Sequence, residues 1–183
     1  MAKRPRKITL EYLDKAALFY LERYASSSEN LKTVLRRKVW RSAREHEVDQ
    51  EQAEVWIGET VARLQQGGWL DDQAWADMRV RSLRYKGESA RSIRMKLAAK
   101  GIDEETATRA LAQDEPDNSD IAAAISYARR RRMGPYRTGD DREERRERDM
   151  AALARKGFGL DLTRRVIDAE DEEALEELLA EVR

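Results

Sequence analysis

The sequence contains no cysteine, a single histidine and only three prolines. Without cysteine the chain forms no disulfides, thiolate nucleophiles or cysteine-based zinc sites, and His46 alone does not make a histidine-pair metal motif. A phosphate-binding loop of the form G-x-x-x-x-G-K-[ST] is also missing. These absences predict a protein that is not an enzyme and that has no catalytic, metal-binding or cofactor-binding residues.

Long apolar runs are absent as well. No stretch approaches the roughly 18 apolar residues of a membrane span. The basic start of the chain leads into amphipathic sequence instead of the apolar core of a secretory signal. We therefore expect a cytoplasmic location and no membrane partner.

The charge of the chain is balanced in total but segregated along its length. The 183 residues carry 36 basic and 36 acidic side chains. Residues 77–100 hold eight basic and two acidic side chains, whereas residues 168–183 hold eight acidic side chains and one basic one. This asymmetry predicts a basic surface that contacts an anionic partner and an acidic end that either repels this partner or folds over the surface.

Apolar side chains recur at steps of three and four along nearly the whole chain, which predicts an all-α protein. Local signals set the helix ends. Ser26 and Glu29 have the spacing of a capping box, and Asp49 can cap the next helix. Glycine pairs and single glycines, such as Gly67-Gly68 and Gly101, supply the left-handed residue that closes a helix.

A short motif occurs twice and, in altered form, a third time. Residues 97–102 read Leu-Ala-Ala-Lys-Gly-Ile and residues 153–158 read Leu-Ala-Arg-Lys-Gly-Phe. Residues 35–40 fit the same frame, but Val39 stands in place of the glycine. The motif ends a helix, so its repetition predicts three copies of one helical unit.

The fold expected from these signals is an elongated, curved tandem array of three-helix, helix-turn-helix-like repeats that is monomeric. The predicted divisions are a basic N-terminal peptide (1–8), a first repeat (9–68), a second repeat (69–113), a linker (114–118), a third repeat (119–169) and an acidic C-terminal helix or tail (170–183).

These motifs resemble the bacterial RecX family, whose members regulate the RecA recombinase. The resemblance covers about residues 17–167. It rests on Ala17-Leu18 through Arg23 with Ser26 to Leu35, on Gly68-Trp-Leu-Asp-Asp72 with Trp75-Ala76, on residues 91–102, on residues 153–158, and on Arg164-Arg-Val-Ile167. Val39 and Trp40 depart from the Lys-Gly pair that is common in the family.

The resemblance implies a negative modulator of RecA. Such a protein binds the RecA filament on single-stranded DNA, inhibits recombinase, ATPase and co-protease activity, and damps the SOS response. An alternative is a helical protein that binds nucleic acid directly, without RecA, through its helix-turn-helix-like units. Zero net charge favours the first interpretation, with at most weak direct DNA binding.

Two basic segments are the candidate contacts for the RecA filament or DNA, because arginine and lysine complement phosphates and acidic protein faces. They comprise Arg79, Arg81, Arg84, Lys86, Arg91 and Arg94 in the second repeat and Arg129, Arg130, Arg131 and Arg132 in the third. The four tryptophans fall near apolar stripes or at a junction of repeats, so we expect them in cores and not as platforms for bases.

Overall fold

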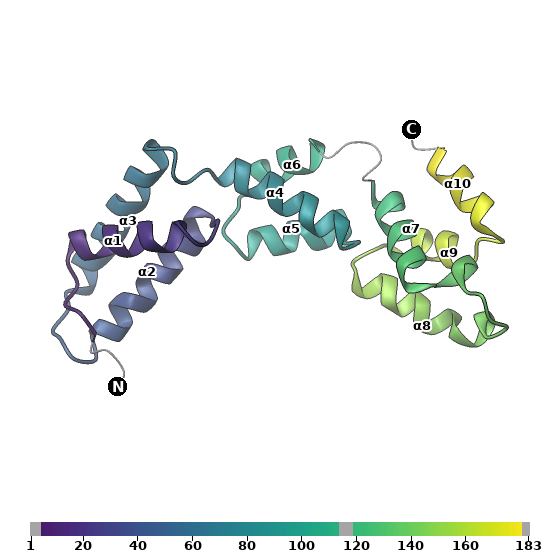
Figure 1. Ribbon diagram of the computed structural model, residues 1–183, viewed down its shortest axis with the longest axis horizontal. Helices are drawn as coiled ribbons and strands as arrows, with labels where there is room; N and C mark the ends of the chain where they lie inside the picture. Colours follow the sequence, from purple (N-terminus) through teal and green to yellow (C-terminus); the bar gives the residue numbers. More distant parts are fainter. Residues whose placement is uncertain (1–4, 114–118, 181–183) are drawn as a thin grey trace. The chain divides into compact units, whose positions relative to one another are not determined.

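The computed structural model describes residues 5–113 and 119–180 (Figure 1). Helices are the only regular structure within these ranges, which confirms the all-α prediction. The α-helices are α1 (Leu10–Leu21), α2 (Ser28–Ser42), α3 (Gln50–Gln66), α4 (Asp72–Tyr85), α5 (Ala90–Ala98), α6 (Glu104–Ala112), α7 (Asp120–Arg131), α8 (Arg142–Arg155), α9 (Leu160–Ile167) and α10 (Glu172–Ala180), and a 3-10 turn, η2, covers Gly134–Tyr136. None of the described helices is both long and apolar enough to cross a membrane.

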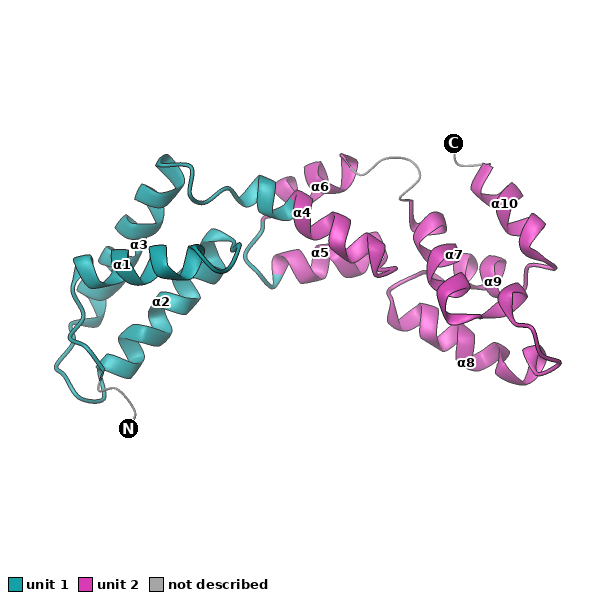
Figure 2. Ribbon diagram, viewed as in Figure 1, with its two compact units in different colours: residues 1–76, 99–102 teal, residues 77–98, 103–183 magenta. Residues whose placement is uncertain are grey.

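The chain divides into two compact units (Figure 2). The first consists of residues 1–76 and 99–102, and the second of residues 77–98 and 103–183. The boundary falls inside α4, so neither unit coincides with one predicted repeat. The repeat boundaries therefore stay predictions, and the predicted linker 114–118 lies outside the described residues.

In the first unit, α1, α2 and α3 enclose one apolar core. Leu13 of α1, Leu31 and Leu35 of α2 and Ile57 of α3 are all 0% exposed. Leu31 and Leu35 are four residues apart and therefore lie on one face of α2, as the sequence pattern predicted. Asp49 accepts a hydrogen bond from the Gln52 amide and caps α3, also as predicted.

The start of α2 differs from the prediction by one residue. Ser27, and not Ser26, is the N-cap, and its Oγ accepts from the Asn30 amide at 3.3 Å. Because Glu29 then lies one position too early for a capping box, its carboxylate instead pairs with Lys32 and with Arg36.

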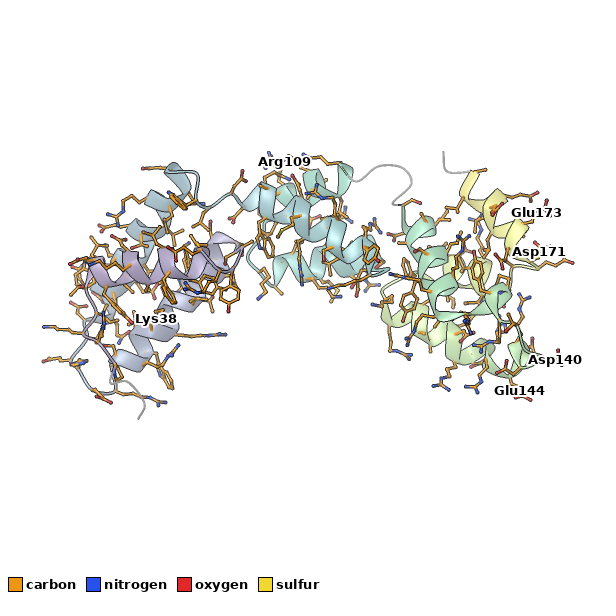
Figure 3. The ribbon with its side chains drawn as sticks, viewed as in Figure 1. Lys38, Arg109, Asp140, Glu144, Asp171 and Glu173 are labelled. Atoms are coloured by element: carbon orange, nitrogen blue, oxygen red, sulfur yellow. The ribbon has the colours of Figure 1, made fainter. Side chains whose placement is uncertain are left out.

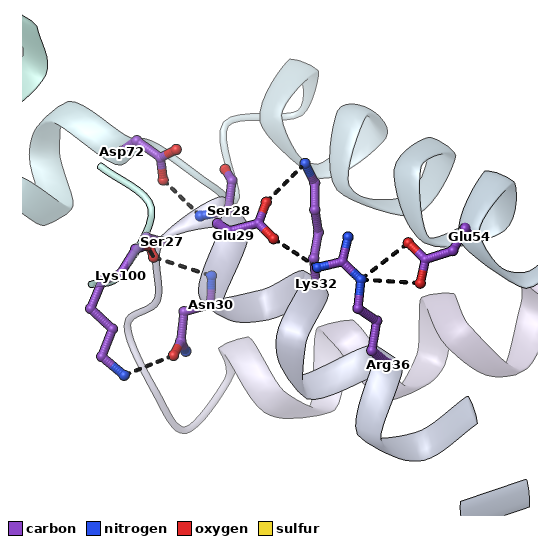
Figure 4. Close-up of polar contacts among 9 residues, drawn as sticks. All are labelled: Ser27, Ser28, Glu29, Asn30, Lys32, Arg36, Glu54, Asp72 and Lys100. Carbon is purple, nitrogen blue, oxygen red and sulfur yellow. Dashed lines mark hydrogen bonds and ion pairs between the residues drawn. The ribbon is translucent and has the colours of Figure 1, made fainter. Parts of the chain in front are cut away.

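The start of α2 is held by two segments that are distant in sequence, an arrangement that we call the first junction (Figure 4). Ser27 Oγ donates to the Lys100 carbonyl at 2.6 Å, and the Ser28 amide donates to Asp72 Oδ1 at 2.7 Å. Lys100 Nζ donates to Asn30 Oδ1 at 3.0 Å. Gly101 has a φ of +75°, and a Cβ added to it would lie 2.3 Å from Glu29 Cβ, so only glycine fits this position.

The second unit has its main core between α7, α8, α9 and α10. Leu153 of α8, Val166 of α9 and Leu175 of α10 are 0% exposed and belong to one cluster. In the same unit, Ile93 and Leu97 of α5 are fully buried. The acidic segment thus forms a helix that packs through Leu175 and Leu178, while residues 181–183 lie outside the described part.

A second junction with a similar arrangement of segments lies at the start of α5. The Ser89 amide donates to the Lys156 carbonyl at 3.2 Å, and the Ala90 amide donates to Asp120 Oδ1 at 2.8 Å. Gly157 has a φ of +89°, and an added Cβ would lie 2.4 Å from Ser89 Oγ. The Lys-Gly pair of the repeated motif is therefore a docking element, in addition to the helix stop that the sequence predicted.

Candidate functional site

The side chains of six of the ten predicted contact residues have no hydrogen-bond or ionic partner among the described residues and leave their charge available. Five of them are exposed and Arg79 is half-buried. They are Arg79, Arg81, Lys86, Arg91, Arg131 and Arg132. We call these six residues the open cations. All belong to the second unit.

Contacts between α4 and α7 bring part of this set together. A Cβ added to Gly87, just after α4, would lie 2.7 Å from Tyr127 Cβ of α7, so the two segments touch at this point. Arg130 of α7 donates to the Tyr85 carbonyl at 2.5 Å, and its guanidinium lies 5.5 Å from the centre of the Tyr85 ring. Lys86 follows Tyr85 and Arg131 follows Arg130 in the sequence, so one open cation from each segment is adjacent in sequence to this contact.

Arg84 is a correction to the predicted set. Its side chain is only 7% exposed and pairs with Asp120 at 2.5 Å. It also donates to the Glu88 carbonyl at 3.2 Å. Because a buried guanidinium in such a network is not accessible to a partner, Arg84 is part of the second junction and not of the contact surface.

Two other predicted contacts already have partners in the chain. Arg94 pairs with Glu104 at 3.0 Å, with both side chains largely exposed. Arg129 donates to Tyr136 Oη at 3.4 Å, and this hydrogen bond raises the pKa of Arg129. Glu172 and Glu176 of α10 add to the increase, which places acidic side chains of α10 near one end of α7. Asp171, which directly precedes α10, and Glu173 of α10 are labelled in Figure 3.

The junction beneath these cations contains a buried carboxylate. Glu88 accepts from Lys156 at 2.9 Å and from Ser92 at 2.6 Å, and it pairs with Lys96 at 2.7 Å. Burial by itself raises the pKa of Glu88, but the hydrogen bonds from Lys156, Lys96 and Ser92 outweigh it and lower the pKa to about 2. Glu88 is therefore ionised at neutral pH, and it forms ion pairs with two nearby cations, Lys96 and Lys156.

The sequence analysis missed the apolar members of this surface. Met78 of α4 is 44% exposed, Tyr85 is 79% exposed and Met95 of α5 is 66% exposed. Met78, Arg81 and Tyr85 have helical spacing of three and four residues, a pattern in the sequence that could have identified a mixed apolar and cationic stripe. Exposed methionine and tyrosine beside arginine are typical of protein-binding surfaces.

The core placement predicted for the tryptophans is wrong for two of the four. Trp40 is 60% exposed and Trp69 is 65% exposed, whereas Trp56 packs against the core of the first unit. At the junction of the first two predicted repeats, Leu70 is the buried residue instead of Trp69. Apolar neighbours in sequence did not indicate which of the indole rings the cores bury.

The chemistry of the surface is that of a binding site. Within the described ranges, no group of three or more histidine, aspartate or glutamate side chains is arranged to hold a metal ion. The available groups are guanidinium and ammonium donors, which are suited to phosphates or carboxylates, together with flexible apolar side chains. These groups are complementary in charge to an anionic partner.

Comparison with known proteins gives consistent matches. A family model described as RecX, second three-helix domain, matches residues 71–111. The Regulatory protein RecX of Myxococcus xanthus is 44% identical over 91% of this chain and 90% of its own length. The Regulatory protein RecX of Agrobacterium fabrum is 34% identical over 98% of this chain and 94% of its own length.

Solved structures agree on the fold. The crystal structure of RecX from Lactobacillus salivarius superposes with a TM-score of 0.63 at 20% identity and covers 92% of this chain and 96% of that one. A second crystal structure of regulatory protein RecX gives a TM-score of 0.62 at 22% identity, with 87% and 71% covered. Because two relatives match this chain over at least 90% of both lengths, at 34% and 44% identity, the chain belongs to the RecX family of regulatory proteins.

Proposed function

We propose that this protein is a negative modulator of RecA. It binds RecA filaments on single-stranded DNA as a monomer, inhibits their recombinase, ATPase and co-protease activity, and thereby damps the SOS response in the cytoplasm. Membership of a family of regulatory proteins supports this proposal, and so does a binding surface built from cations and exposed apolar side chains.

The observation that carries the proposal is the distinction between paired and open cations in the second unit. Arg84, Arg94 and Lys96 are engaged within the chain, whereas the six open cations have no acidic partner among the described residues. An arginine without a local partner meets an anionic surface without first losing an ion pair. In this proposal the open cations meet the filament together with the exposed Met78, Tyr85 and Met95 of the same unit.

The test is a titration of single-stranded-DNA-dependent ATP hydrolysis by RecA from the same organism. The variant Arg91→Gln with Arg131→Gln removes two open cations. The matched control, Arg94→Gln with Arg109→Gln, removes two cations of the same unit that pair with Glu104 and Glu105. If each lost contact is worth about 1 kcal/mol, the first variant needs up to about thirty-fold more protein for the same inhibition. The control stays close to the wild type.

Two results would contradict the proposal. Equal inhibition by both variants would remove the open cations from the interface. No inhibition by several-fold excess of the wild-type protein, with filaments shown to be intact by electron microscopy, would favour the alternative of a nucleic-acid-binding protein that acts without RecA.

A further inference from the structure

One face of α2, in the first unit, carries an exposed tryptophan between arginines. Arg37, Trp40, Arg41 and Arg44 follow one another at steps of three, one and three residues, so they lie along one side of the helix and its C-terminal extension. All four are exposed. We call this row the α2 stripe.

One of these arginines stacks on the Trp40 ring. The Arg44 guanidinium lies 3.8 Å from the centre of the indole ring and covers one face. The residue is still 60% exposed. A cation stacked on one face orients the indole and leaves apolar ring surface in contact with water, which costs free energy unless another flat group covers it.

The arginines of the α2 stripe lack acidic partners among the described residues. Arg41 Nε donates to the Arg37 carbonyl, and Arg37 and Arg44 form no ion pair in this part of the chain. Arg36, one helical turn before Trp40, contrasts with them because it pairs with Glu29 at 2.7 Å and with Glu54 at 3.0 Å. Arg36 is thus neutralised within the chain, whereas Arg37, Arg41 and Arg44 are not.

Further positive charge lies beside the C-terminal end of the helix. Ser42 Oγ donates to the Arg6 carbonyl at 2.8 Å, and His46 Nε2 is hydrogen-bonded to the Pro5 carbonyl at 3.0 Å. These bonds place the exposed Arg6 and Lys7 next to α2.

Lys38, which is labelled in Figure 3, adds a sixth cation. Burial lowers the pKa of Lys38, and the charge of Arg41 lowers it further. Glu45 and Glu47 follow in the loop, so acidic groups are outnumbered at this end of the helix.

We propose that the α2 stripe binds single-stranded nucleic acid, with an unstacked base on Trp40 and the flanking phosphates on Arg37, Arg41 and Arg44. An aromatic ring flanked by cations is the arrangement that binds single strands without sequence preference. A duplex keeps its bases stacked on one another and presents only phosphates to the arginines. The site therefore favours single strands over duplexes.

Two other exposed aromatic residues of the first unit lack this combination. The Arg23 guanidinium lies 3.7 Å from the centre of the Phe19 ring, but Arg23 also pairs with Glu22 at 3.4 Å. Trp69 is as exposed as Trp40, but two glycines precede it and Asp71 and Asp72 follow it closely. Trp69 therefore serves as a matched control, because it has the same ring and exposure without the cations.

The experiment measures fluorescence anisotropy of a fluorescein-labelled oligo(dT) strand titrated with the full chain in the absence of RecA. Trp40→Ala weakens binding roughly 5- to 150-fold, the range for loss of one stacked base. Trp40→Phe retains a ring and most of the affinity, while Trp69→Ala binds like the wild type. Circular dichroism melts of each variant check that the fold is intact.

The salt dependence tests the arginines separately. Replacing Arg37, Arg41 and Arg44 together by Gln lowers the slope of log K against log salt concentration by about two, because each lost phosphate contact on a single strand contributes about 0.7. A labelled duplex of equal length binds the wild type more weakly than oligo(dT) does, and Trp40→Ala removes this difference.

Equal affinities for the wild type and for Trp40→Ala would overturn the proposal, as would an equal loss in Trp40→Ala and Trp69→Ala. If Trp40→Ala lowered the inhibition of RecA but not the binding of oligo(dT), the stripe would be a protein contact and the proposal would be wrong. The site does not rest on the proposed function, because its affinity is measured without RecA.

Discussion

The two junctions bring together the same kinds of segment but use different chemistry. In each, a serine at the start of a helix meets the backbone of a Lys-Gly pair, and an aspartate accepts from the next amide. The first junction is completed by a hydrogen bond that Lys100 Nζ donates to the side-chain oxygen of Asn30. The second is completed by the buried carboxylate of Glu88 and the buried guanidinium of Arg84.

This difference shows which parts of the junction the backbone requires. Both glycines have positive φ and lie against the neighbouring helix start, so no side chain fits at either position. The polar groups around the two glycines differ in charge, so the backbone arrangement does not require one particular set of side chains. The second junction adds ion pairs, between Arg84 and Asp120 and from Glu88 to Lys96 and Lys156, which make it sensitive to loss of a single partner and to acid.

The largest effect is expected from Asp120→Ala. It removes the carboxylate that pairs with the buried Arg84 and that caps the Ala90 amide, and we expect a loss of about 4 kcal/mol in the free energy of unfolding. The counterpart in the first junction, Asp72→Ala, removes one charge-assisted hydrogen bond and costs about 2 kcal/mol. Urea titrations followed by circular dichroism measure both. Equal losses would mean that the ionic network adds nothing to the second junction.

The glycines come next. Gly101→Ala and Gly157→Ala each combine an unfavourable positive φ with a steric overlap, and we expect each to cost about 3 kcal/mol. Gly68→Ala is the control, because Gly68 has a φ of +72° but no atom within 4 Å of an added Cβ. It should cost only about 1 kcal/mol. If all three variants melted at the same temperature, close approach at the junctions would play no part.

The smallest expected effect is a difference in acid stability. The pKa of Glu88 is about 2 in the folded chain against an ordinary value of 4.5, so its contribution to stability is complete above pH 4.5 and is lost as the pH falls towards 2. Glu88→Gln lowers stability by about 2 kcal/mol at pH 7 and flattens the fall below pH 4.5.

Glu29→Gln is the matched variant near the first junction. The pKa of Glu29 is also lowered, chiefly by the hydrogen bond from Arg36, but its side chain is 42% exposed. Solvent screening makes its effect on acid unfolding smaller than that of Glu88→Gln. Parallel melts of the two variants from pH 7 to 2 test this order, and the reverse order would contradict the assignment of acid sensitivity to the second junction.

Helix ends were predictable because their signals are local. Asp49 caps α3 where the sequence placed a cap, and Gly101 has the positive φ expected of a helix stop. The exchange of glycine for Val39 in the third copy of the motif also has a reason in the structure. Val39 continues α2 and is buried in the core of the first unit, so no left-handed residue is needed there.

The contact residues were predictable only as a class. Arg81 and Arg84 lie on one helix, three positions apart, with identical chemistry, yet Arg81 is exposed and Arg84 is buried against Asp120. The partner is 36 positions away in sequence. No periodicity within α4 contains that information, because it depends on where α7 begins in space.

Local sequence thus determined the helices, their caps and the glycine stops, since each depends on the backbone conformation of a few adjacent residues. It also established the segregation of charge. Packing between distant segments decided which cations remain open, why Trp40 faces water, and why Lys-Gly recurs. These outcomes depend on which surfaces are buried against one another, and burial is a property of the folded chain as a whole.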